Sequence, residues 1–198
     1  MAFWTNSGNT EPKRNFRFQV SMTGLNEDKG GTGTNAKATQ QILWWAKKVT
    51  KPNFTIAEGK HVYLGHTFYY PGKVEWQEIS MTLVDPVTPN ASAIFMDMVA
   101  KSGYVLPKKP DGQVATVATL GKKGFVDSAK GIGEVVITQL DHEGGTVEQW
   151  TLHGTFFKSL KFGDLDYEND DLSNIEVGLR YDWAECNTGG SDFFAINS

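Results

Sequence analysis

Ile175-Glu176-Val177-Gly178-Leu179-Arg180-Tyr181-Asp182-Trp183 is the stretch with the most regular alternation in the sequence. Its odd-numbered positions are all apolar or aromatic, and its even-numbered positions carry polar side chains or glycine. Successive side chains of a β-strand point to opposite faces of a sheet. The period of two therefore predicts one long, half-buried strand over residues 175–183.

The same alternation occurs in other parts of the chain. Residues 15–22 and 77–83 each predict a half-buried strand. Residues 134–142 and 147–154 flank Gly144-Gly145, which predicts a β-hairpin with a glycine turn. Less regular strands are expected at 43–49, 61–70 and 155–162. Together these patterns predict a mainly β protein with seven or eight antiparallel strands.

One helix is expected to interrupt the strands. Thr88 as N-cap and Pro89 as the first helical residue predict its start, and it should end before Gly103. A short second helix is expected within 124–129, and residues 24–35, rich in Gly, Asn and Thr, predict a flexible loop. No linker divides the 198 residues, so a single domain is predicted for 1–198.

Known chemical motifs are missing from the sequence. It holds no glycine-rich nucleotide-binding motif and no nucleophile or metal motif of the common enzyme classes. His61 and His66 are expected on opposite faces of one strand, and residues 164–171 lack the glycine and glutamate of a calcium loop. We therefore expect no catalytic residue, no cofactor and no metal, and an acidic turn in solvent at 164–171.

Charge and aromatic content limit the possible partners. The net charge of −4 argues against a protein that holds nucleic acid by its phosphates. Trp44 and Trp45 lie next to lysines, a pattern that fits a nucleic-acid stacking platform, a strand with one solvated lysine face, or a protein-docking surface. No apolar run is long enough for a signal peptide or a membrane span, so no membrane anchor and synthesis in the cytoplasm are expected.

Several segments resemble, in order and spacing, the tail tube proteins of contractile-tailed (myovirus-type) bacteriophages. These segments are Asn15–Val20, Lys51-Pro52, Tyr70–Trp76, Leu83–Pro86, Phe162–Tyr167 and Tyr181–Ala184. The resemblance covers about residues 14–185, which we take as the core of the domain, with short extensions at both ends.

The resemblance implies a β-sandwich or partial barrel with one flanking helix. Such subunits form homohexameric rings, and strands of all six line the continuous β-barrel lumen of a stacked tube. The implied partners are further copies of the chain, the tail sheath protein, and the baseplate and tail-terminator proteins. The tape measure protein and then genomic DNA pass through the lumen without specific binding, and the implied location is the virion, assembled in a bacterial host.

Two sets of residues are expected to serve this role. Contacts between rings or with the sheath are expected from aromatic residues, namely Phe3, Trp4, Phe54, Tyr63, Phe68, Tyr69 and Tyr70. A lumen that lets a polyanion slide should offer no free cations, and the expected lining residues are Glu78, Ser80, Thr82, Thr138, Gln149 and Thr151. The alternatives are a tube protein of a baseplate initiator, of a contractile injection particle or of a type VI-like system, and a monomeric carbohydrate- or nucleic-acid-binding β-sandwich.

Overall fold

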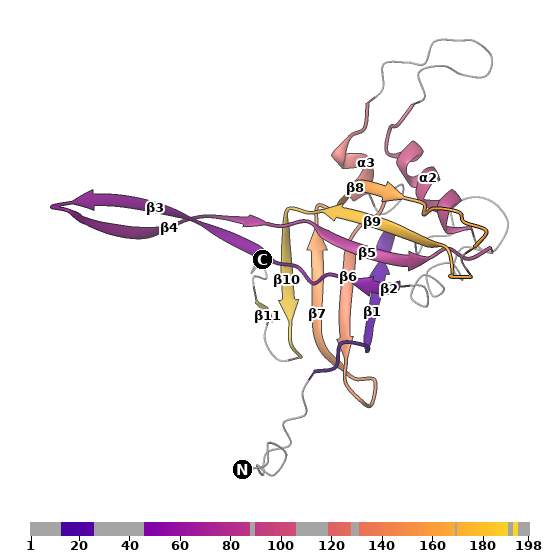
Figure 1. Ribbon diagram of the computed structural model, residues 1–198, viewed down its shortest axis with the longest axis horizontal. Coiled ribbons are helices and arrows are strands. Elements are labelled where there is room, and N and C mark those ends of the chain that lie inside the picture. The colour runs from indigo at the N-terminus through magenta and orange to yellow at the C-terminus, as the bar shows by residue number, and fades with distance from the viewer. Residues whose placement is uncertain are drawn as a thin grey trace.

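The computed structural model describes residues 13–25, 46–87, 90–105, 119–127, 131–168, 170–189 and 192–193. Within these ranges the chain forms eleven strands, two α-helices and one 3-10 helix, η1 (Thr23–Leu25). The strands make two packed sheets and one separate hairpin that projects from them (Figure 1). Residues 26–35 of the predicted flexible loop lie outside the described residues, as do Phe3, Trp4, Trp44 and Trp45.

The larger sheet has five antiparallel strands in the order β1-β6-β7-β10-β11. Their bounds are Phe18–Met22 (β1), Val135–Leu140 (β6), Thr146–His153 (β7), Trp183–Asn187 (β10) and Asp192–Phe193 (β11). The predicted glycine hairpin is confirmed as β6 and β7. Asp141 holds its turn, because the carboxylate accepts hydrogen bonds from the backbone N–H groups of Glu143 and Gly145 at 2.8 and 2.7 Å.

The smaller sheet has four antiparallel strands in the order β2-β5-β9-β8. Their bounds are Ala46–Val49 (β2), Ile79–Val84 (β5), Asn174–Arg180 (β9) and Phe156–Lys161 (β8). The alternation predicted for 77–83 is confirmed, since Ile79, Met81 and Leu83 are buried while Ser80 between them is exposed.

The hydrophobic core lies between the two sheets. Val20, Val135 and Leu152 come from the five-stranded sheet, and Met81 and Val177 come from the four-stranded sheet. The strands of the two sheets cross steeply, as in an orthogonal sandwich (Figure 1). The outer face of each sheet therefore points away from the other.

The long strand predicted for 175–183 is wrong in one respect, because it is two strands in two sheets. The chain leaves the four-stranded sheet after Arg180, turns at Tyr181 and Asp182, and enters the five-stranded sheet at Trp183. The backbone N–H of Asp182 donates to the carbonyl of His153 at 2.9 Å, which fixes this corner. Orthogonal sandwiches are joined by such strands that change sheets.

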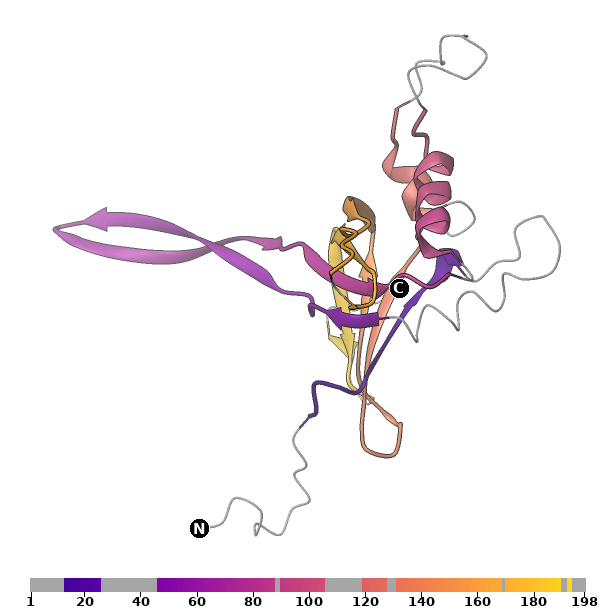
Figure 2. The same ribbon diagram turned by 45° about the vertical axis from the view of Figure 1, so that its right-hand side comes forward.

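The helices close one end of the sandwich (Figure 2). Helix α2 (Ala91–Lys101) is capped by Asn90, whose side chain accepts from the N–H of Ala93 at 2.9 Å, so the predicted N-cap Thr88 is wrong. Helix α3 (Lys122–Val126) begins two residues before the predicted segment. The rings of Phe95 and Phe125 both lie edge-on to Phe157 of β8, at 5.6 and 5.9 Å, and so join the helices to the sheet.

Candidate assembly surfaces

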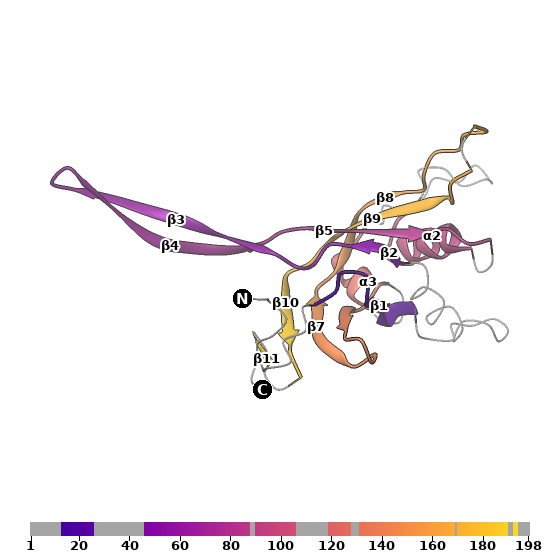
Figure 3. The ribbon, with the colours of Figure 1, turned by 60° about the horizontal axis from the view of Figure 1, so that its bottom comes forward.

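A long two-stranded hairpin extends beyond the sandwich (Figures 1 and 3). It consists of β3 (Phe54–Tyr63) and β4 (His66–Trp76), which follow β2 and precede β5 in the chain. Every residue from 54 to 75 is exposed. An isolated hairpin of two strands is at most marginally stable in water, and the distal part of this one has no third strand or helix of the described residues packed on it.

The hairpin corrects the prediction of a single strand over 61–70. Leu64 and Gly65 form its turn, with φ values of 48° and 78°. Two consecutive positive φ angles are typical of the tight turn that matches the twist of a hairpin, and Asn-Gly or Asp-Gly usually supplies them. Because leucine stands at the first position here, the usual sequence signal is missing.

The base of the hairpin is fixed to the sandwich. Trp76 packs edge-on against Phe54 at 5.0 Å and contacts Tyr181 at 5.9 Å. Arg180 and Glu75 form an ion pair at 3.3 Å, and the Tyr181 hydroxyl donates to the carbonyl of Asn53 at 3.4 Å. Burial raises the pKa of Tyr181, which therefore stays a neutral donor. The base is thus held in place while the distal half is in solvent.

The two faces of the distal half differ in chemistry. Paired residues of antiparallel strands share a face, and the register pairs Gly59 with Tyr70, His61 with Phe68, and Tyr63 with His66. We call this the aromatic face; it contains no carboxylate, lysine or arginine. The opposite face carries Glu58, Lys60, Val62, Thr67, Tyr69 and Pro71.

The predicted contact residues divide between these locations. Tyr63, Phe68 and Tyr70 lie together on the aromatic face, Tyr69 lies on the opposite face, and Phe54 lies at the base. The prediction that His61 and His66 lie on opposite faces is wrong. They belong to the two strands of one hairpin, whose register puts both on the aromatic face.

The six predicted lumen residues do not share one surface. Glu78, Ser80 and Thr82 lie on the outer side of the four-stranded sheet, and Thr138, Gln149 and Thr151 lie on the outer side of the five-stranded sheet. In the second set, Thr138 pairs directly with Gln149. Since the core separates the two outer sides, only one of these two sets of three residues can line the predicted lumen.

Three of the cations beside the first set are paired with carboxylates. Lys158 binds Glu78, Lys161 binds Glu176 at 3.1 Å, and Arg180 binds Glu75. The second set lies in rows without lysine or arginine, in which Gln19, Thr138 and Gln149 are neighbours. The second set therefore has the character expected of a wall that does not hold a polyanion. The first set differs, because Thr82 pairs across the strands with Lys48, which is exposed and is in no ion pair within the described part of the chain.

Known structures share this arrangement of strands. No protein-family model matches the sequence, and no curated protein matches it. A chain of the anti-feeding prophage (AFP) baseplate, solved by cryo-EM with six-fold symmetry, superimposes with a TM-score of 0.60 at 14% identity, covering 92% of this chain and 99% of its own. A chain of the PVC sheath/tube terminator, from an extracellular contractile injection system, superimposes with a TM-score of 0.59 at 14% identity. The match covers 91% of this chain and 100% of the terminator chain. A chain of the AFP tube-terminating cap superimposes with a TM-score of 0.57 at 16% identity. The match covers 96% of this chain and 100% of the cap chain.

The chain has the fold of contractile-injection-system proteins. The predicted fold class, a mainly antiparallel β protein, is thereby confirmed, and so is the resemblance to tube proteins of contractile systems at the level of the fold. The match spans nearly the whole of these chains and more than nine tenths of this one.

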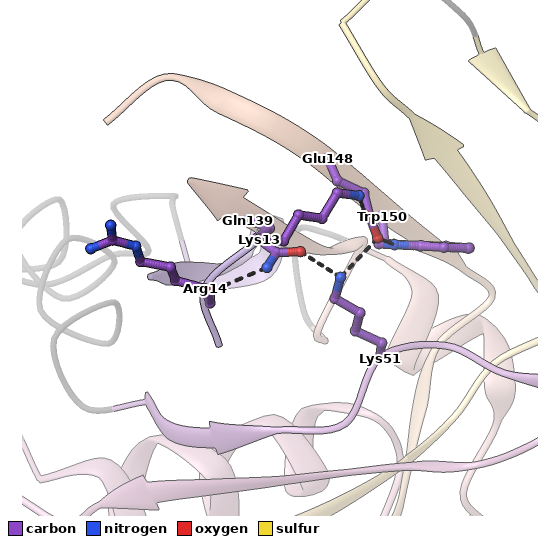
Figure 4. A network of polar contacts seen from close by, with 6 residues as sticks. All are labelled: Lys13, Arg14, Lys51, Gln139, Glu148 and Trp150. Atoms are coloured by element: carbon purple, nitrogen blue, oxygen red, sulfur yellow. Dashed lines mark hydrogen bonds and ion pairs between the residues drawn. The ribbon is translucent and has the colours of Figure 1, made fainter. Parts of the chain in front are cut away.

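A buried carboxylate joins the two sheets of this injection-system fold (Figure 4). Glu148 of β7 accepts hydrogen bonds from the ammonium groups of Lys13 and Lys51 and from the indole N–H of Trp150. Lys51, which follows β2, also donates to the Gln139 side chain of β6 at 2.6 Å. The network therefore connects the segment before β1 and the β2–β3 connection to the five-stranded sheet.

Opposing effects set the charge of Glu148. Burial raises its pKa, but the hydrogen bonds from Lys13, Trp150 and Lys51 outweigh burial and bring the pKa from 4.5 to about 2. The carboxylate is therefore ionised over the physiological range. Nearby Cys186 is buried and unpaired, and burial and the Glu148 charge raise the pKa of its thiol.

Among the described residues, no three His, Cys, Asp or Glu side chains are grouped so that they could hold a metal ion. In the same part of the chain, none of the helices has the length and hydropathy needed to cross a membrane.

Proposed function

We propose that the chain is a structural subunit that assembles with copies of itself into the inner tube of a contractile particle, such as a phage tail. The observation that carries the proposal is the free hairpin of β3 and β4. Its aromatic face exposes Tyr63, Phe68 and Tyr70, and contiguous apolar surface of this kind marks an interaction site.

Self-assembly accounts for the shape of the subunit. The hairpin extends well past the sandwich, so in an assembly it reaches a neighbouring copy. Six copies would form a ring, and stacked rings would form a tube inside the sheath, begun at a baseplate and closed by a terminator. The tape measure protein and then the genome would pass through the lumen. A role in building a conduit requires no catalytic residue, and we propose none.

A second role within the same class has a specific observation in its favour. The structures that share the fold include a baseplate chain, a sheath/tube terminator and a tube-terminating cap. A subunit that starts or ends a tube would form a ring and stop, whereas a tube subunit would continue to stack. A tube that carries protein instead of DNA would use the same subunit contacts.

Negative-stain electron microscopy of the purified chain, with light-scattering mass on the same sample, tests the proposal. Hollow filaments support the tube role, and rings that do not stack support an initiator or terminator. A chain that stays monomeric is mixed with preformed tube or baseplate seeds. Growth on the seeds supports the proposal, and a persistent monomer contradicts it in favour of a ligand-binding sandwich.

A further inference from the structure

The loop between β8 and β9 displays apolar side chains in an acidic setting. Leu165 and Tyr167 are fully exposed, although both are large and apolar. Asp164 and Glu168 stand on either side of them, and neither carboxylate takes part in an ion pair among the described residues. We call residues 162–168 the acidic loop. Exposed apolar side chains with charged neighbours are typical of a protein-docking element.

A groove beside β2 has the complementary composition. It has a volume of about 370 Å³ and lies between the two sheets, with walls from Phe18, Val49, Ile137 and Trp150. Lys47 and Lys48 lie along it, both exposed, and within the described part of the chain neither is in an ion pair. The groove therefore has an apolar interior and a basic rim.

The loop and the groove lie at opposite edges of the four-stranded sheet. The acidic loop follows β8, the last strand of that sheet, and the groove adjoins β2, the first. We propose that the acidic loop of one copy docks in the groove of the next, with Leu165 and Tyr167 against the apolar walls and the carboxylates near Lys47 and Lys48. This inference rests on the proposed self-assembly and specifies one of its contacts.

Strand direction and charge both favour this pairing. Directions alternate across the order β2-β5-β9-β8, so a β2 edge placed beside the β8 edge of another copy continues the antiparallel alternation. Two acidic loops repel each other, as do two basic grooves, so like surfaces are disfavoured. Contact between unlike surfaces is head-to-tail, and repetition of it gives a closed ring or a helical filament.

Charge reversal on each surface tests the inference. Asp164→Lys/Glu168→Lys makes the loop basic, and Lys47→Glu/Lys48→Glu makes the groove acidic. A third chain carries all four changes. Lys101→Glu/Lys123→Glu is the matched control, because it changes the net charge as Lys47→Glu/Lys48→Glu does but on helices α2 and α3. Thermal melting followed by circular dichroism shows that each chain is folded.

The readout is the lowest concentration at which sedimentation and electron microscopy detect assembly. We expect each single-surface variant to raise it at least about tenfold, since like charges are strongly disfavoured at an interface. An equimolar mixture of the two variants, and the chain with all four changes, should assemble as the wild type does. Tyr167→Ser should weaken assembly without changing any charge, and the control should have no effect.

The outcomes separate this inference from the proposed function. If the wild type assembles and the folded single-surface variants assemble equally well, the inference is wrong and the proposed function stands. Failure of the mixture and of the four-change chain to recover assembly would also overturn it. A wild type that stays monomeric even with seeds contradicts both.

Discussion

Glu148 shows how a single side chain can join distant parts of this chain. It is 7% exposed on the core side of β7, where an unpaired carboxylate would be strongly destabilising. Its partners Lys13 and Lys51 are far away in sequence. The alternation of 147–154 predicts that position 148 faces inward, but only the tertiary fold brings the two lysines to it, so local sequence patterns could not reveal the network.

The shifted pKa of Glu148 makes a prediction about acid stability. Since the pKa is about 2 in the folded chain and 4.5 ordinarily, the carboxylate stabilises the fold above pH 4.5, and this contribution is lost as the pH falls toward 2. Its full size is on the order of 3 kcal/mol. We expect Glu148→Gln to lower the free energy of unfolding by about 1–3 kcal/mol at pH 7, with a smaller difference at pH 3.

Urea unfolding followed by tryptophan fluorescence, at concentrations where the chain is monomeric, measures this difference. Glu143→Gln is the control, because Glu143 is an exposed carboxylate in the β6–β7 turn. The control should behave as the wild type at both pH values. An equal effect of Glu148→Gln at pH 7 and pH 3 would show that the ionised carboxylate is not the source of the stability.

Among the elements, the hairpin of β3 and β4 was the least predictable. Strands with one buried face, such as β5, follow the alternation, because the core selects apolar residues at every second position. The hairpin has no buried face in the single subunit, so no core selects apolar residues at every second position of its strands. The corner at Tyr181 was missed for a related reason, since both of the strands it joins face the same core and the alternation continues across it.

The register of the hairpin predicts unequal effects for two neighbouring tyrosines. Tyr70 lies on the aromatic face, and Tyr69 lies on the face that carries Glu58 and Lys60. A face without carboxylates, lysines or arginines loses less hydration on burial, so we expect Tyr70→Asp to raise the assembly concentration about tenfold or more and Tyr69→Asp to have a smaller effect.

Sedimentation of both variants over a range of concentrations provides the comparison. Both side chains are exposed in the subunit, so thermal unfolding should be unchanged in either variant and serves as the internal control. A larger loss of assembly with Tyr69→Asp than with Tyr70→Asp would show that the opposite face makes the contact. If both variants assemble as well as the wild type does, the hairpin is not part of the contact between copies.

For the whole molecule, the two outer sides of the sandwich give two candidate walls for the lumen of the proposed tube, which experiment can distinguish. Lysines that face a passing polyanion slow it, so a pair placed on the lumen side should delay DNA release and a pair on the other side should not. Thr138→Lys/Thr151→Lys tests the five-stranded sheet, and Ser80→Lys/Thr82→Lys tests the four-stranded sheet. Each double variant is the control for the other.

DNA release from assembled particles is timed for both variants, and electron microscopy verifies that the tubes are intact. We expect only one pair to slow release, and that pair identifies the wall. Normal release from both sets of particles would show that neither outer side lines a DNA channel.

The position of the hairpin on one side of the sandwich would give the proposed assembly a direction. If the proposed tube forms and the hairpin makes the contact between rings, each copy would insert its hairpin into a neighbour on one side and receive a hairpin on the other. The two ends of such a polymer would then differ chemically, because one would display free hairpins and the other would display empty receiving surfaces. Different proteins would be needed to bind the two ends.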